Sequence, residues 1–240
     1  MVKEDFWYDG VSARSMGITL REPVVVGGAI PRIERVSVPG RNGDFIYFDG
    51  SYENRPAEAS CFALKSKNVM QNVTRINNWL LGNFGYKELV IPEDRDHFFL
   101  ATVENGAEIN TKLAMLAPFE IEFSCKPQRF LNFGKEMITI QDLEAVVTNP
   151  TQFPSKPLIH FYTSADSFEV FFGDETISSD SIGVSNFWFD CETQNAYSTP
   201  QNLNSKIKTS GEIVLRPGAS TIGIIDGISK IEIIPRWWEL

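Results

Sequence analysis

The alternation of apolar and polar residues along the chain predicts a protein built mainly from short β-strands. Successive side chains of a strand point to opposite faces of its sheet, so a half-buried strand is apolar at every second position. The segment Phe119–Cys125 follows this rule, with Glu120, Glu122 and Ser124 on its polar side, and Pro127 and the segment Phe130–Phe133 are expected to end it. Other segments of the first half that are expected to be strands are Phe6–Tyr8, Ser15–Leu20, Ala59–Leu64, Lys87–Ile91, His97–Glu104 and Ala107–Leu113.

A long hairpin is predicted between residues 33 and 48. Two alternating runs, Ile33–Val38 and Phe45–Phe48, flank the turn-forming segment Pro39–Asp44. Asn42-Gly43 supplies the positive-φ positions that a tight hairpin turn requires, and Asp49-Gly50-Ser51 predicts a second turn. A two-stranded hairpin is only marginally stable in water. We therefore expect this hairpin to lie against something else, either the rest of this chain or a neighbouring copy of it.

The 3.6-residue period of an amphipathic helix occurs at Lys67–Leu81. Its apolar positions fall on one face of the helix, and they are Val69, Val73, Ile76, Trp79 and Leu80. Asn68 or Ser66 is suited to cap the start, and Gly82 is suited to the left-handed position just past the end. Because apolar stripes on helices usually face a core, Trp79 is expected to be a core anchor rather than a ligand contact.

From Asn149 onward short strand candidates alternate with turn signals at nearly even spacing, a pattern typical of a β-sandwich. We place a domain boundary at Gly134, which divides the chain into residues 1–133 and residues 134–240. The predicted strands of the second domain are Leu158–Tyr162, Phe168–Phe172, Gly183–Asp190, Gly211–Leu215, Thr221–Ile225 and Lys230–Pro235. The fold class expected from these patterns is mainly β, with one helix and a projecting hairpin arm.

Composition and charge narrow the classes of function. The 240 residues are 42% hydrophobic and 22% charged, which is typical of a globular protein. The net charge of −9 is uneven: residues 1–133 carry 15 Lys and Arg against 17 Asp and Glu, and residues 134–240 carry 7 against 14. Nucleic-acid binding requires clustered Lys and Arg to neutralise phosphates. The acidic balance therefore argues against DNA or RNA as a partner.

The cysteines and the N-terminal residues bear on the compartment and on metals. Cys61, Cys125 and Cys191 are far apart and odd in number, so we expect three free, buried thiols. With no CxxC pair and only two histidines, no metal site and no cofactor are expected. The first ten residues lack an apolar secretion signal, and no run is long enough to span a membrane. We expect synthesis and folding in a reducing cytoplasm.

Three clusters of residues are candidates for a binding or catalytic site. Phe187–Asp190 with Glu192 suggests an aromatic sugar platform with carboxylates, but alternating aromatic residues in a strand are ordinarily core. Pro92–His97 is a dense polar cluster without the ligand spacing of a calcium loop, so a solvated turn is favoured. Trp237 and Trp238 are adjacent, so one is expected to be buried and the other more exposed. No catalytic residues are assigned.

Two sets of motifs together resemble siphophage distal tail proteins, a family also described as phage tail components. The N-terminal set is Phe6-Trp7-Tyr8-Asp9-Gly10, Ser15-Met16-Gly17-Ile18, Val38-Pro39-Gly40-Arg41-Asn42-Gly43-Asp44 and Gly50-Ser51-Tyr52-Glu53-Asn54-Arg55. The C-terminal set is similar to the galectin-like second domain of that family, and it comprises Asn149-Pro150, Pro157-Leu158-Ile159, Phe189-Asp190-Cys191-Glu192, Ala196-Tyr197, Leu215-Arg216-Pro217-Gly218 and Ile231–Trp237. The matches span nearly the whole chain in the family's order.

The resemblance implies a structural protein of the tail tip and no enzymatic activity. Family members form a ring, typically hexameric, whose first domain, a β-sandwich or split barrel, walls the channel while a hairpin arm embraces the adjacent subunit. The ring joins the tail tube protein to the tail-associated lysin or hub protein, and receptor-binding proteins attach at its periphery. The arm here corresponds to residues 36–52. Its implied subunit contacts are Val38, Pro39, Gly40, Arg41, Asn42, Gly43, Asp44, Phe45, Tyr47 and Tyr52.

Two other functions remain open from the sequence. A carbohydrate-binding β-sandwich would contact host glycans or a partner through Trp188, Trp237 and Trp238. A glycoside hydrolase subunit would need a pair of carboxylates in a cleft, which the sequence does not identify. Some relatives carry a carbohydrate-binding module inserted in the second domain, but residues 134–240 are only 107 residues long and show no insertion.

Overall fold

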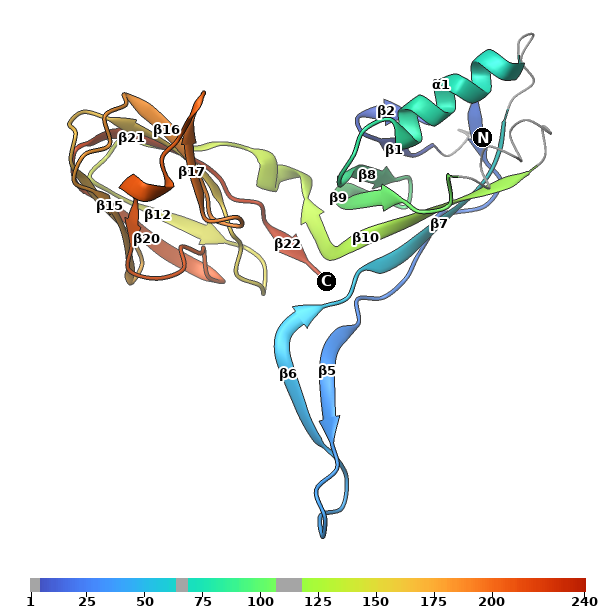
Figure 1. Ribbon diagram of the computed structural model, residues 1–240, viewed down its shortest axis with the longest axis horizontal. Coiled ribbons are helices and arrows are strands. Elements are labelled where there is room, and N and C mark those ends of the chain that lie inside the picture. The colour runs from blue at the N-terminus through green and yellow to red at the C-terminus, as the bar shows by residue number, and fades with distance from the viewer. Residues whose placement is uncertain (1–4, 64–68, 107–117) are drawn as a thin grey trace. The chain divides into compact units, whose positions relative to one another are not determined.

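The computed structural model describes residues 5–63, 69–106 and 118–240 and divides the chain into two compact units (Figure 1). The N-terminal unit is Met1–Arg129 with Leu240, and the C-terminal unit is Phe130–Glu239. The units therefore part four residues before the boundary expected at Gly134. Among the described residues strands predominate and α1 is the single α-helix, as the sequence patterns predict. Each unit is described by itself below.

The N-terminal unit is a curled antiparallel sheet with α1 packed on it (Figure 1). The strands of the main sheet run in the order β2-β1-β8-β9-β10-β7-β3, and β4 also pairs with β7. Their bounds are β1 Trp7–Tyr8, β2 Val11–Ser12, β3 Ile18–Leu20, β4 Val25–Val26, β7 Arg55–Ala63, β8 Lys87–Ile91, β9 Asp94–Val103 and β10 Phe119–Leu131. The expected strand at Ala107–Leu113 lies outside the described residues.

The helix α1 spans Val69–Leu81, and its buried face carries Val73, Ile76, Trp79 and Leu80. The Trp79 indole packs against Phe6 and Tyr8, and its Nε1–H donates to the Tyr8 carbonyl oxygen at 2.8 Å. Trp79 is thus a core anchor, as predicted. The expected caps Ser66 and Asn68 lie outside the described residues.

Three local expectations in this unit are wrong. The strand β10 continues through Pro127 and ends at Leu131, inside the segment Phe130–Phe133 that was also expected to end it; pairing with β7 stops at Cys125, so Pro127 needs no amide for that ladder. Asp49-Gly50-Ser51 forms an irregularity inside the strand β6 (Phe45–Tyr52) rather than a turn, with the Ser51 amide and hydroxyl donating to Asp49 Oδ1. Gly82 has no positive φ; the left-handed glycine after α1 is Gly85.

The C-terminal unit contains two antiparallel sheets that enclose one core (Figure 1). One has the order β11-β21-β13-β16-β17-β18 and the other β12-β20-β14-β15-β19. The elements are η1 Asn132–Lys135, β11 Ile138–Ile140, β12 Glu144–Asn149, β13 Leu158–Thr163, β14 Phe168–Phe172, β15 Glu175–Ser179, β16 Asn186–Asp190, β17 Asn195–Ser198, β18 Gln201–Asn202, η2 Asn204–Lys206, β19 Lys208–Thr209, β20 Gly218–Asp226, β21 Ile228–Ile234 and β22 Trp238–Glu239.

This core is aromatic and aliphatic, with Phe161, Phe168 and Phe187 in mutual ring contact. The expected strand at Gly211–Leu215 does not form; Leu215 makes only an isolated bridge to Ser155, while Ile213 and Leu215 are buried in the core. Ile213 and Leu215 therefore contribute to the core of this unit from a loop rather than from a strand. Strands with few apolar residues, such as β15 and β17, were not predicted because their alternation is weak.

Candidate subunit interface

The strands β5 (Pro31–Val36) and β6 form a two-stranded ribbon that is separate from every other described sheet, and Figure 1 shows it extending away from β7 and β10. We use the name arm for residues 31–52, the whole ribbon, which includes the residues 36–52 expected from the sequence. The Glu53 amide donates to the Ile30 carbonyl oxygen at 2.8 Å, so the chain leaves and rejoins the sheet domain at adjacent points. The arm is therefore an appendage whose path does not interrupt the rest of the unit.

The tip of the arm is an eight-residue loop, because the last strand pair is Val36 with Phe45. The Arg41 amide donates to the Val38 carbonyl oxygen at 3.1 Å, and Gly40 has φ +80°. Pro39 followed by a positive-φ glycine is the pattern of a type II turn. Gly43 has the positive φ expected of it, +80°, but Asn42 does not, and the tight two-residue turn expected there does not form. Pro39 lacks the amide needed to extend the ladder, so the strands separate before that dipeptide.

The arm exposes an unusual amount of apolar surface. Phe45, Ile46, Tyr47 and Phe48 are 49%, 54%, 55% and 43% exposed. No residue of the arm belongs to the N-terminal core. The large apolar residues of a soluble domain are normally buried, and a contiguous exposed set marks a contact surface. This ribbon is the candidate interface.

The residues expected to make subunit contacts lie together on this arm. Nine of them are exposed, and they are Val38, Pro39, Gly40, Arg41, Asn42, Gly43, Asp44, Phe45 and Tyr47. Tyr52 is half-buried and makes an edge contact with Phe48 at a centroid distance of 5.5 Å. Val36, Ile46 and Phe48 lie within the expected range 36–52 but are not among the contact residues named from the sequence, and Ile33 lies outside that range, although the strand alternation already places apolar residues at all four positions.

Trp188 lies in a second, mixed cluster on the six-stranded sheet of the C-terminal unit. The His160 ring stacks on it with centroids 4.1 Å apart. Beside them Glu232 accepts hydrogen bonds from the Tyr162 hydroxyl at 2.9 Å and from Lys230 Nζ at 2.7 Å. One face of the Trp188 indole is therefore already covered by protein.

The two C-terminal tryptophans differ in burial, as their adjacency predicts. Trp237 is 3% exposed and belongs to the core, so the expectation that it contacts a partner or glycan is wrong: its side chain is buried. Trp238 is half-buried; it stacks on Phe153 at 4.5 Å and donates Nε1–H to the Pro154 carbonyl oxygen.

Two of the carboxylates singled out in the sequence, Asp190 and Asp94, are held in ion pairs. Arg236 binds Asp190 through two contacts, at 2.7 Å and 3.4 Å. Burial alone would raise the pKa of Asp190, but the hydrogen bond and charge of Arg236, together with hydrogen bonds from the backbone amides of Glu192 and Thr193, outweigh it and hold this pKa below its ordinary value. Asp94 in the Pro92–His97 segment contacts His97 Nδ1 at 2.6 Å and Arg129 at 3.4 Å. Asp190 thus links the end of β16 to the segment after β21, and Asp94 links the start of β9 to β10.

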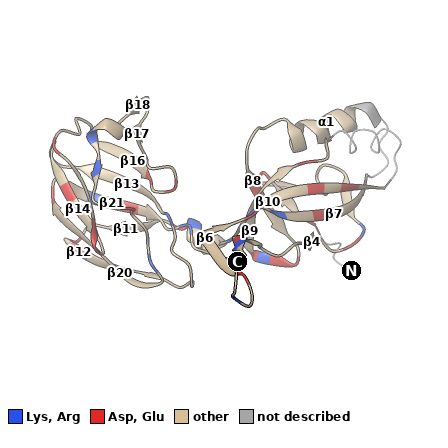
Figure 2. Cartoon of the chain, turned by 60° about the horizontal axis from the view of Figure 1, so that its bottom comes forward, with Lys and Arg blue, Asp and Glu red and all other residues tan. Residues whose placement is uncertain are grey.

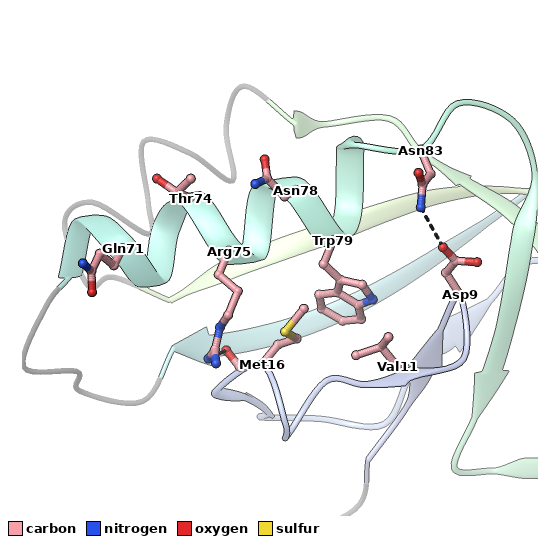
Figure 3. Close-up of a pocket in the computed structure, with 9 residues that line it drawn as sticks. All are labelled: Asp9, Val11, Met16, Gln71, Thr74, Arg75, Asn78, Trp79 and Asn83. Atoms are coloured by element: carbon pink, nitrogen blue, oxygen red, sulfur yellow. Dashed lines mark hydrogen bonds between the residues drawn. The ribbon is translucent and has the colours of Figure 1, made fainter.

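A hollow of about 650 Å³ in the N-terminal unit lies between α1 and the first strands (Figure 3). Its charged groups are Asp9 and Arg75. The Asn83 side chain donates to Asp9 at 3.0 Å, and Arg75 donates to the Met16 carbonyl oxygen and to Asn72. The Trp79 ring lines its inner wall (Figure 3). The lining holds a single carboxylate, so it does not offer the acid pair of a glycosidase.

The three thiols are buried and free, as predicted. Burial raises the pKa values of Cys61 and Cys125 to about 12 and also raises that of Cys191. Within the described ranges no group of three or more His, Cys, Asp and Glu side chains is placed to hold a metal ion. No helix among the same residues has the length and apolar character needed to cross a membrane.

Neither a family model nor a curated protein matches the sequence. A search of solved structures does find a match: the crystal structure of the SPP1 Dit (gp 19.1) protein, described as a paradigm of the hub adsorption apparatus in phages infecting Gram-positive bacteria. It aligns with a TM-score of 0.68 over 96% of this chain and 97% of that chain, at 14% identity. The chain has the Dit fold. Because the alignment includes nearly all of both chains, the likeness covers the N-terminal and C-terminal units alike.

Proposed function

We propose that this chain is a structural component of a bacteriophage or prophage tail tip, where copies of it form a ring-shaped hub. In this proposal the ring, a hexamer, joins the tail tube protein to the tail-associated lysin or hub protein and supports receptor-binding proteins. The full-length match to the Dit protein supports the tail-tip role. The galectin-like label of the second domain belongs to this proposal, as do location at the virion tail tip and synthesis in the bacterial host cytoplasm.

The observation that carries self-assembly is the apolar, exposed arm. A two-stranded ribbon is marginally stable by itself, and burial of its apolar side chains against a second subunit supplies the missing stabilisation. A ribbon with unpaired edges can also add strands to a neighbouring sheet. Contacts of one surface with a different surface of the next copy generate a ring when the rotation closes. The ion-paired carboxylates favour this structural role over catalysis.

Excision of the arm tests the proposal. Replacing Pro31–Tyr52 by Asn-Gly joins Ile30 to Glu53, whose backbone atoms already share a hydrogen bond, and it removes no residue of the core. We expect a folded monomer with native thermal stability, whereas the intact chain forms a ring in light scattering and in negative-stain images.

Phe84→Ala is the control, because Phe84 is fully exposed on a loop outside the arm and its loss removes an exposed aromatic side chain without touching the arm. This variant is expected to assemble like the intact chain. Rings formed by the excised chain, or a monomeric intact chain at all protein concentrations, would contradict the proposal.

The second candidate function is glycan binding at the Trp188 cluster. It is favoured by the position of Trp188, next to His160 and the polar side chains of Asn186 and Glu232 on one sheet face, a mixture of aromatic and hydrogen-bonding groups. A glycan array distinguishes it: binding that Trp188→Ala abolishes would support this function, and an array without signal would remove it.

A further inference from the structure

The strand register places large apolar residues on both faces of the arm. Residues directly opposite each other in an antiparallel pair share a face, and the face alternates along each strand. Ile33, Arg35, Ile46 and Phe48 therefore form one face, called the Arg35 face. Glu34, Val36, Phe45 and Tyr47 form the other, called the Glu34 face.

The two faces are exposed to similar extents. Ile33, Ile46 and Phe48 are 39–54% exposed on the Arg35 face, and Val36, Phe45 and Tyr47 are 43–55% exposed on the Glu34 face. A hairpin that rests on one surface is normally polar on the side that faces water. In a head-to-tail ring each subunit extends one arm and receives one. One neighbour thus covers one face and leaves three large apolar side chains exposed.

The charges distinguish the faces. Arg35 lies opposite Ile46 and Glu34 lies opposite Tyr47, so neither charge faces an opposite charge across the ribbon. Each copy of this chain carries a net charge of −9. On its N-terminal unit Glu58 and Glu122 lie directly opposite each other on β7 and β10, and both are exposed. Figure 2 marks acidic positions in red along both strands. Such a surface complements Arg35 and repels Glu34.

We propose that the arm is a two-sided docking element. Resting on the ring assembly proposed above, the Arg35 face packs on the next copy of this chain. The Glu34 face stays open in the isolated ring and docks a different protein whose contact surface is apolar and carries Lys or Arg. The arm then couples ring formation to the attachment of a second tail component.

Cysteine labelling of the purified ring tests the two faces separately. The native thiols are fully buried and have raised pKa values, so an introduced exposed thiol is the reactive one. Ile46→Cys reports on the Arg35 face and Tyr47→Cys on the Glu34 face. On assembly we expect loss of maleimide labelling at Ile46→Cys and retained labelling at Tyr47→Cys. Protection of both thiols, or of Tyr47→Cys alone, overturns the proposal.

The chemistry of the second partner is tested on the same ring with two β-forming peptides, one alternating Leu with Lys and one alternating Leu with Glu. We expect the Leu-Lys peptide to protect Tyr47→Cys and the Leu-Glu peptide to leave it reactive. Adding Glu34→Lys should reverse this preference, which separates a specific docking face from general attraction to an acidic ring. An unchanged preference in Glu34→Lys overturns the assignment.

The outcomes also separate this inference from the proposed function. Assembly through the arm itself is contradicted if the intact chain remains monomeric. It is also contradicted by a ring in which the thiols of Ile46→Cys and Tyr47→Cys both stay reactive. A ring with only Tyr47→Cys protected leaves arm-mediated assembly intact and overturns the two-sided assignment alone.

Discussion

At the scale of single residues, several side chains that the sequence offers as candidates for binding or catalysis stabilise the fold instead. Trp79 stacks in the core of the N-terminal unit and donates a hydrogen bond to the Tyr8 carbonyl, and the buried Tyr8 hydroxyl has its pKa raised to about 12. Trp237 fills the second core. Asp190 and Arg236 hold the end of β16 to the segment after β21. The exposed aromatic residues of the arm differ from these side chains, because they belong to no core.

The Asp190–Arg236 pair predicts a pH-dependent contribution to stability. Its charge-assisted hydrogen bonds are worth about 1.5 kcal/mol, so Asp190→Asn should lower the free energy of unfolding by about that amount at pH 7. The folded-state pKa of Asp190 is lowered, so the contribution is complete above the unfolded pKa of about 3.9 and is lost as the pH falls through the lower folded value.

Urea unfolding at several pH values measures this difference. Asp180→Asn is the matched control, because its partner is Lys208 and both side chains are mostly exposed, so we expect almost no change at any pH. An Asp190→Asn effect that did not shrink as the pH was lowered from the unfolded pKa of Asp190 toward acid would show that the side chain acts through packing rather than through its charge.

At the scale of elements, the connections matter as much as the strands. Gly227 is the one residue between β20 and β21, which belong to different sheets of the C-terminal unit. It has φ +66°, and a Cβ at this position would lie 1.9 Å from the Ser167 carbonyl oxygen. A residue with a side chain cannot make this crossing without displacing the loop between β13 and β14.

We therefore expect Gly227→Ala to lower the free energy of unfolding by more than about 2 kcal/mol, through backbone strain and the clash together. Gly173→Ala is the control: its φ is +60°, but no atom lies within 4 Å of the added Cβ, so it should lose only about 1 kcal/mol from strain. Chemical denaturation compares the free energies of unfolding of the two variants. Equal losses would mean that the loop between β13 and β14 moves aside without cost.

At the scale of the whole molecule, the chain consists of two units with separate cores. This arrangement predicts that residues 130–239 fold alone, with a cooperative transition in thermal unfolding. A fragment that starts at Leu143 is the control, because it lacks β11 and its buried Ile140 and exposes the edge of β21. It should unfold at a lower temperature; equal stability would remove β11 from the folding unit.

Much of the fold followed from local patterns. The period-2 alternation located Phe119–Cys125 and Phe168–Phe172, and the 3.6 period located α1, because one face of each element must be apolar to be buried. Strands poor in apolar residues and the continuation of β10 through Pro127 were not predictable, because partners distant in the chain decide them.

The sequence by itself determined a mainly β chain with one helix, three buried thiols and a long hairpin, since these depend on local period, turn chemistry and residue polarity. Only the tertiary structure decided which apolar residues have partners. Phe187 and Phe45 look alike in the sequence, yet Phe187 is enclosed by the second sandwich sheet and Phe45 meets no core. Burial depends on what folds over a residue, and among the described residues of the N-terminal unit no core includes a residue of the arm.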